Sequence, residues 1–255
     1  MAVRNSAFGS AEPTRRDRWM WRAAITCALL VALLLLHGQR WDVVMASGPF
    51  LLKSLGVSWL LTLAAIGIGL PAGILLALLR TAGPPPLRQI AVGVIEVVRA
   101  TPQLMVIFWI FFAVPAMTGH KVPAWTAAIV SLSLIAASYL AEVVRAGVQS
   151  VPRIQTESGL VTGLTRVQIF SSIVLPQALR NMIPALIATL VMMFKTTSLI
   201  YVVGITDFFR AVILINNREF EPVALYTTLA AGYFACCWLL SWIVRRLDPA
   251  YVLAH

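Results

Sequence analysis

The residues that could do chemistry in this chain are charged side chains within long apolar stretches. Glu96 and Arg99 stand three residues apart, and so do Glu142 and Arg145. At this spacing two side chains meet on one face of a helix. Burying a charge in a bilayer costs free energy, so such residues are candidates for function. Each pair can equally be structural, because the two charges would neutralise each other, and the sequence leaves both interpretations open.

Lys195 differs, because no acidic residue lies three or four positions from it. It could line a solute path and meet a substrate carboxylate, or it could extend to the membrane interface. The three histidines are scattered without metal-ligand spacing. No Ser/His/Asp or paired-carboxylate constellation indicates an enzyme. We therefore expect no catalytic site, and no metal and no cofactor bound by this chain.

The composition indicates an integral membrane protein. Of 255 residues, 60% are hydrophobic and only 12% are charged, and the formal net charge is +10. Soluble domains are nearer half apolar and a quarter charged. No basic face interleaved with aromatic residues is present, so a nucleic-acid role is excluded. The positive charge is better explained by membrane orientation.

Six apolar segments predict an all-α protein with about six transmembrane helices, at residues 19–36, 54–79, 89–114, 124–146, 181–204 and 223–244. The Arg-rich start before the first segment could mark a cleaved signal peptide. No small-residue cleavage site directly follows Leu36, so we favour a retained span. Thr101-Pro102 interrupts the third segment with a capping residue and a helix-starting proline, which predicts that a helix restarts there.

The distribution of Lys and Arg predicts the orientation. Thirteen lie on one side of these segments and five on the other, with Arg99 and Lys195 inside them. The positive-inside rule then places both termini and the loop between the fourth and fifth segments in the cytoplasm. In the second segment, Gly69 and Gly73 form a G-x-x-x-G pattern, which predicts close packing against another helix.

That loop, residues 150–180, is polar and predicts a short helix–turn–helix. Ser150 can cap a first helix at about 151–162, and Gly163 can end it in a left-handed conformation. Small residues at Ser158 and Gly159 would leave a low surface that another protein could approach. An amphipathic helix lying on the membrane is the alternative, and both stay open.

The second short helix has a complete start signal. Thr165 and Gln168 form a capping box, and Leu164 and Ile169 flank it as a hydrophobic staple. We expect this helix to run to Leu175, where the following proline bends the chain toward the fifth segment.

Several motifs together resemble one family. ESG at 157–159, GL at 163–164 and LPQALR at 175–180 resemble the EAA loop of ABC-importer membrane subunits. Three more resemble its polar amino-acid permease branch, namely RATPQL at 99–104, SYLAEVVRAG at 138–147 and KTTSL at 195–199. The motifs follow the family order over about residues 54–247. The departures from the family pattern are Ser158, Gly159, Thr162, Ala188 and Thr196.

The resemblance implies a five-helix type I ABC importer core at 54–247, an extra span within 1–53 and a cytoplasmic tail at 248–255. It implies a permease subunit in the bacterial inner membrane that takes up a polar amino acid or related small solute. The implied partners are a cytoplasmic ABC ATPase dimer, a second permease subunit (copy or paralogue) and an extracytoplasmic solute-binding protein. ATP and Mg would belong to the ATPase, because no lysine here follows glycine as a Walker A loop requires.

The resemblance also implies residue roles. The ATPase-coupling residues would be Arg153, Gln155, Glu157, Ser158, Gly159, Gly163 and Leu164. The candidates for the translocation path or gate would be Glu96, Arg99, Thr101, Pro102, Tyr139, Glu142, Arg145, Lys195, Thr197 and Ser198. Two other classes stay open on the residues alone: an ion-coupled secondary transporter or channel, and a membrane scaffold or sensor.

Overall fold

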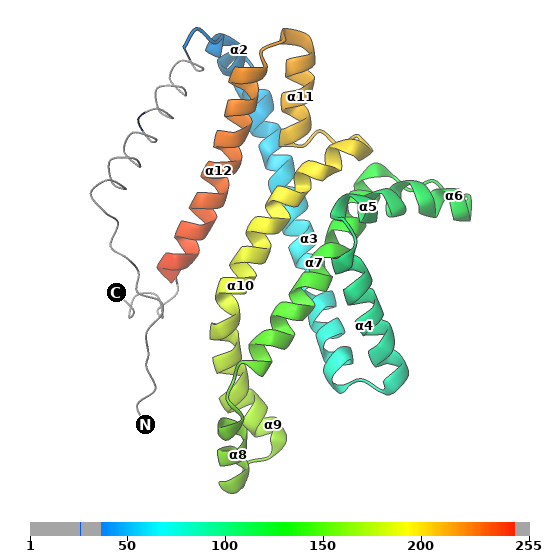
Figure 1. The fold of residues 1–255 in the computed structure, drawn as a ribbon, viewed down its shortest axis with the longest axis vertical. Coiled ribbons are helices and arrows are strands. Elements are labelled where there is room, and N and C mark those ends of the chain that lie inside the picture. Colours follow the sequence, from blue (N-terminus) through cyan, green and yellow to red (C-terminus); the bar gives the residue numbers. More distant parts are fainter. Residues whose placement is uncertain (1–25, 27–36, 248–255) are drawn as a thin grey trace, which may run out of the picture.

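The computed structural model describes residue 26 and residues 37–247, and every regular element in that part of the chain is helical (Figure 1). The α-helices are α2 Trp41–Ala46, α3 Gly48–Ala82, α4 Pro85–Ala100, α5 Gln103–Phe108, α6 Val114–Thr118, α7 Ala124–Gln149, α8 Arg153–Val161, α9 Arg166–Ile169, α10 Leu175–Thr196, α11 Phe208–Glu219 and α12 Pro222–Leu247. Two π-helical turns, η1 Trp109–Ala113 and η2 Phe170–Val174, and one 3₁₀ helix, η3 Thr197–Val203, join some of them.

Four helical runs are long and apolar enough to cross a bilayer: Gly48–Ala82, Ala124–Gln149, Arg166–Val203 and Pro222–Ile243. A fifth candidate is the pair Pro85–Ala100 and Gln103–Thr118, whose two parts are bent by 113°. The predicted first span, 19–36, lies outside the described residues. The total of six spans therefore stays a prediction, while the all-α membrane fold is confirmed.

The predicted interruption at Thr101-Pro102 is confirmed, but not its capping. Thr101 is extended (φ −89°, ψ 139°), as expected for a residue before proline, and α4 ends at Ala100. Pro102 occupies the N-cap position of α5, and no side chain caps that helix. The prediction that Thr101 caps it is therefore wrong, since Pro102 supplies the start through its fixed φ.

Several stretches outside the six predicted spans are helical. The second span begins at Gly48 rather than at 54, with a proline in its first turn. Residues 205–222, between the last two predicted spans, contain α11 Phe208–Glu219, and the stretch after the third predicted span is helical as far as Thr118. Apolar periodicity missed these helices because they are short or polar on one face.

Helices α3 and α7 pack through the two glycines of the predicted motif. A Cβ added at Gly69 would lie 2.7 Å from Cβ of Ala136, and one at Gly73 would lie 2.8 Å from the backbone oxygen of Ala137. The two backbones are thus too close for any other residue. The predicted close-packing role of Gly69 and Gly73 is confirmed, and α7 is its partner.

We expect Gly73→Ala to destabilise the protein by about 1–3 kcal/mol, because the added methyl group collides with backbone that cannot rotate away. Gly67→Ala is the matched control. It lies on the same helix, and a Cβ there meets nothing within 4 Å. Thermal unfolding in detergent should show a lower midpoint for Gly73→Ala alone. Equal midpoints for the two variants would contradict the packing role.

Asp207 holds the start of α11 from a fully buried position. Its carboxylate accepts hydrogen bonds from the backbone N–H of Arg210 (2.9 Å) and of Phe209 (3.2 Å). Burial nonetheless raises the pKa of Asp207 from 3.8 to about 6, because the three backbone hydrogen bonds and the Arg210 charge do not offset the lost hydration. The neighbouring backbone N–H of Phe208 is held by the Ser58 hydroxyl of α3 at 3.1 Å.

The raised pKa of Asp207 predicts a pH effect on stability. Between about pH 4 and pH 6 the carboxyl group holds a proton in the folded protein but has lost it in the unfolded chain. The contribution of Asp207 to the free energy of unfolding therefore falls as the pH rises. The total change is about 3 kcal/mol. The melting midpoint should therefore fall more between pH 4 and pH 6 for the wild type than for Asp207→Asn, which keeps a capping oxygen. Parallel curves for the two proteins would refute this.

Candidate functional site

The predicted helix–turn–helix forms one end of the molecule, where α8 lies outside the candidate spans and α9 begins the run Arg166–Val203 (Figure 1). Gly163 adopts a left-handed φ of +81° and closes α8, as predicted. The capping box is also confirmed: the Gln168 N–H donates to the Thr165 hydroxyl (3.3 Å), and the Thr165 N–H donates to the Gln168 side chain (2.9 Å). Ile169 and Leu164 share one hydrophobic cluster, as a staple requires.

Two expectations for this loop are wrong. Ser150 does not cap α8, whose N-cap position is held by Pro152. Its hydroxyl instead donates to the Gly147 carbonyl (2.7 Å) and accepts from the Asn181 amide (2.8 Å), which ties the end of α7 to α10. The second helix also does not end at Leu175, because the run continues from Arg166 to Val203. A π-helical turn directly precedes Pro176 and accommodates the residue that lacks an N–H.

The surface of α8 differs from the predicted one. Gly159 is buried, and a Cβ there would lie 2.8 Å from Ile169. This glycine therefore lets α8 pack onto the next helix, and the expectation that it faces a partner is wrong. Ser158 is exposed, as are Arg153, Gln155 and Glu157. Three large apolar side chains on the same short helix are also exposed: Ile154 (62%), Leu160 (49%) and Val161 (89%).

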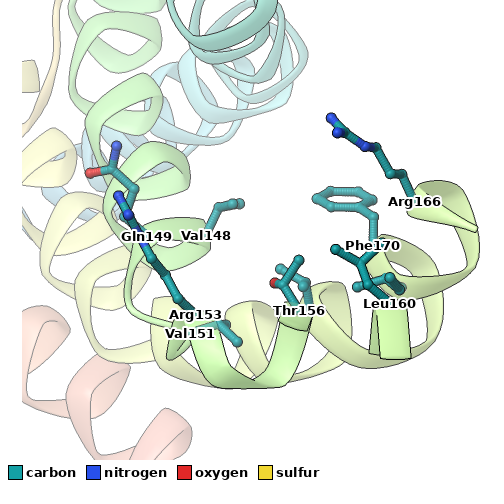
Figure 2. Close-up of a pocket in the computed structure, with 10 residues that line it drawn as sticks. Val148, Gln149, Val151, Arg153, Thr156, Leu160, Arg166 and Phe170 are labelled. Carbon is teal, nitrogen blue, oxygen red and sulfur yellow. The ribbon is translucent and has the colours of Figure 1, made fainter. Parts of the chain in front are cut away.

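A pocket of about 850 Å³ lies between α8, α9 and the end of α7. Figure 2 shows its two walls, with Gln149 and Arg153 on one side and Arg166 and Phe170 on the other. Thr156 lies between the two walls, and Leu160 lies beside Phe170. The pocket is therefore mainly apolar and carries an arginine at each rim.

A second cluster lies where α3, α4 and α7 approach this end of the bundle, and Glu142 is its centre. The carboxylate is within ion-pair distance of Arg145 (2.8 Å) on its own helix and of Arg99 (3.7 Å) on α4, and it also contacts Arg80 on α3. The predicted pair of Glu142 with Arg145 is confirmed. One acidic side chain thus joins three helices.

The other predicted pair is wrong. Glu96 contacts Arg80 at 3.4 Å, while Arg99 turns to Glu142 and lies over the Tyr139 ring, with its guanidinium carbon 5.6 Å from the ring centroid. Sequence reasoning missed Arg80. The sequence contains a signal for it, because Arg80 ends a predicted span and has no acidic residue one turn away.

A third group lies at the breaks in the helices. The Thr196 hydroxyl, where α10 gives way to η3, lies 2.9 Å from the Gln103 side-chain oxygen at the start of α5. Thr197 and Ser198 donate their hydroxyls to the carbonyls of Phe194 and Lys195. Lys195 is exposed and forms no ion pair among the described residues, so it does not join the Glu142 cluster. Gln103 is a further contact that sequence reasoning did not single out.

Residues 69–252 match the family model described as the inner membrane component of binding-protein-dependent transport systems. The chain belongs to this family. It is thus a permease subunit, and the ion-coupled transporter and the scaffold are not supported.

Several relatives of known name indicate which members of this family the chain is similar to. The chain is 32% identical to the glutamate/aspartate import permease protein GltK of Escherichia coli O6:H1, over 81% of this chain and 97% of that protein. It is 30% identical to the glutamine transport system permease protein GlnP of Escherichia coli K12, over 82% and 95%. It is 32% identical to the L-cystine transport system permease protein TcyB of Bacillus subtilis, over 86% and 96%.

Solved structures agree with the fold. An amino acid ABC transporter solved with histidines superposes with a TM-score of 0.79 and 27% identity, covering 83% of this chain and 98% of that chain. The MetNI methionine ABC transporter, in an inward-facing conformation, gives a TM-score of 0.59 at 21% identity and covers 79% of this chain and 94% of that chain. The latter likeness concerns the fold alone. The predicted ABC-importer permease fold is confirmed.

In this permease Glu142 should carry more stability than Glu96. Its side chain is 17% exposed and faces three arginines, whereas that of Glu96 is 57% exposed and faces one. Glu142→Gln leaves those arginines without their shared counter-charge, and we expect a loss of about 3 kcal/mol. For Glu96→Gln we expect less than about 1 kcal/mol. The measurement is the thermal unfolding midpoint in detergent, and similar shifts for both variants would refute the central role of Glu142.

Proposed function

We propose that this permease imports a polar amino acid or a related small solute. Three of its relatives carry names for glutamate/aspartate, glutamine and L-cystine transport, and together they align with most of the chain. An extracytoplasmic binding protein would deliver the solute. A second permease subunit, either a copy or a paralogue, would complete the pathway.

The observation that carries the proposed coupling is the exposed apolar surface of α8. Ile154, Leu160 and Val161 lie on a short helix outside the spans, where apolar side chains indicate a protein partner. The proposed partner is a cytoplasmic ABC ATPase dimer, which would bind ATP and Mg. With Arg153 and Arg166 at the rims of the neighbouring pocket, the complementary ATPase surface would be apolar at its centre and acidic at its edge.

This assignment sets the orientation and the location. With α8 in the cytoplasm, α11 would face the outside of a bacterial inner membrane, and with the predicted first span retained both termini would be cytoplasmic. The excess of Lys and Arg on the α8 side supports the same orientation.

The remaining candidates divide between two proposed tasks. The Glu142 cluster would close the cytoplasmic mouth, because its ion pairs join α3, α4 and α7 and must rearrange if those helices separate. Thr101, Pro102, Lys195 and Ser198 would line the solute path near the helix breaks, with the buried Thr197 behind them. The Lys195 ammonium would meet the carboxylate of an amino acid.

Gly163→Pro tests the coupling. Proline fixes φ near −65°, so it cannot adopt the +81° of this turn, and α8 should lose its position. Each 1.4 kcal/mol lost from docking weakens the affinity tenfold, and we expect ATPase binding and uptake to fall by about tenfold or more. The measurements are ATPase co-purification and uptake of a labelled amino acid.

Gly163→Asn is the matched control, because asparagine tolerates the left-handed conformation. It should keep both activities, and both variants should insert into the membrane at wild-type levels. If Gly163→Pro retained wild-type ATPase binding and uptake, the coupling assignment to α8 would be wrong.

A further inference from the structure

Two adjoining pockets open on the α3–α4 side of the permease, beside the Glu142 cluster. The first, of about 420 Å³, is lined by Arg80, Thr81, Arg88, Val92, Arg145 and Gln149. The second, of about 460 Å³, is lined by Gly83, Pro85, Arg88, Gln89, Val92 and Gly93. Arg88 and Val92 belong to both, so the two form one continuous groove that is basic at one end and mainly apolar at the other.

The basic end has more positive charge than its acidic neighbours neutralise. Arg80 is shared between Glu142 and Glu96, and Arg145 also pairs with Glu142. With Arg88 and the nearby Arg99 included, four arginines face two glutamates. The Arg88 side chain is exposed and forms no hydrogen bond or ion pair with the described residues. The groove thus carries an excess positive charge and one guanidinium free to bind an anion.

The apolar end follows the outer surface of α4. That helix buries Ala91, Ile95 and Val98 against the protein, so the opposite face points outward. Ile90 is exposed on that outer face, and a Cβ added at Gly93 would meet nothing within 4 Å. Gly93 therefore leaves open space beside Val92 on the exposed face of α4.

The groove lies at the turn between two candidate spans. Helix α3 carries Arg80 and Thr81 in its last turn and ends at Ala82, and α4 begins at Pro85. At such a turn a guanidinium reaches the phosphate layer while the neighbouring helix faces acyl chains.

We propose that this groove is a binding site for an anionic phospholipid. The phosphodiester would bind at Arg88, at the edge of the Arg80–Glu142–Arg145 cluster, and one acyl chain would lie along Val92 and Gly93. Arg88 supplies planar, paired donors for phosphate oxygens. The occupied groove would cover the α3–α4 turn beside the proposed cytoplasmic gate, so membrane composition would act on that gate.

The test uses the full-length chain purified in detergent, depleted of lipid and then titrated with phosphatidylglycerol. Native mass spectrometry reports the bound lipid, and thermal unfolding reports stabilisation. Phosphatidylglycerol should raise the melting midpoint of the wild type, and phosphatidylcholine should not. Arg88→Gln should weaken phosphatidylglycerol binding about fivefold, the effect of one basic residue near an anionic headgroup. Gly93→Leu, which fills the open space beside Val92 without changing any charge, should weaken it independently.

Arg218→Gln is the matched control, because it removes an exposed arginine at the opposite end of the molecule and should leave binding unchanged. Wild-type retention of phosphatidylglycerol by both Arg88→Gln and Gly93→Leu would overturn the proposal. If inorganic phosphate alone raised the melting midpoint as much as phosphatidylglycerol does, the groove would bind a free anion and the lipid assignment would be wrong. Separation of two permease copies by Arg88→Gln, with lipid binding intact, would show a protein interface instead.

Discussion

The contact on which the rest of this permease depends is the close approach of α3 and α7. Gly69 and Gly73 let the two backbones meet, and no larger residue fits between them. In a bilayer, where lipid chains are as apolar as the side chains, such packing supplies much of the association between helices. It also brings Arg80 at the end of α3 to Glu142 on α7, which then reaches Arg99 on α4. The charged cluster is therefore a consequence of two glycines placed two and three turns away.

Local signals explain which parts of this structure could be predicted from the sequence. The capping box at Thr165, the turn at Gly163 and the break before Pro102 depend on residues within four positions of each other, and all three are present. The G-x-x-x-G pattern predicted close packing, but not that α7 is the partner. Pro176 predicted a bend, yet a π-helical turn carries the helix through it. Whether a proline breaks a helix depends on the packing around it.

The charged residues also show that local sequence spacing does not determine which side chains pair. A spacing of three residues was equally present for Glu96 with Arg99 and for Glu142 with Arg145, and only the second pair forms. Arg99 has a closer set of partners from α7, because Tyr139 and Glu142 lie one turn apart on the face that α4 meets. The sequence contains both residues of each pair, but it does not show where the neighbouring helix lies. Likewise, the role of Gly159 depended on Ile169, which approaches it only after the turn at Gly163 is made.

The position of α8 explains how a proposed pull by an ATPase would reach the spans. The helix is joined to α7 at one end and, through α9 and η2, to α10 at the other. Those two spans are held to each other beside it, since the Asn181 amide donates to Ser150 and Gly147 leaves room only for the Met182 side chain. A force on α8 would therefore act on the ends of α7 and α10 together. At the far end of α10, Thr196 contacts Gln103 at the broken helix. A displacement of α10 would thus act at the break, where Thr196 and Thr197 are both buried.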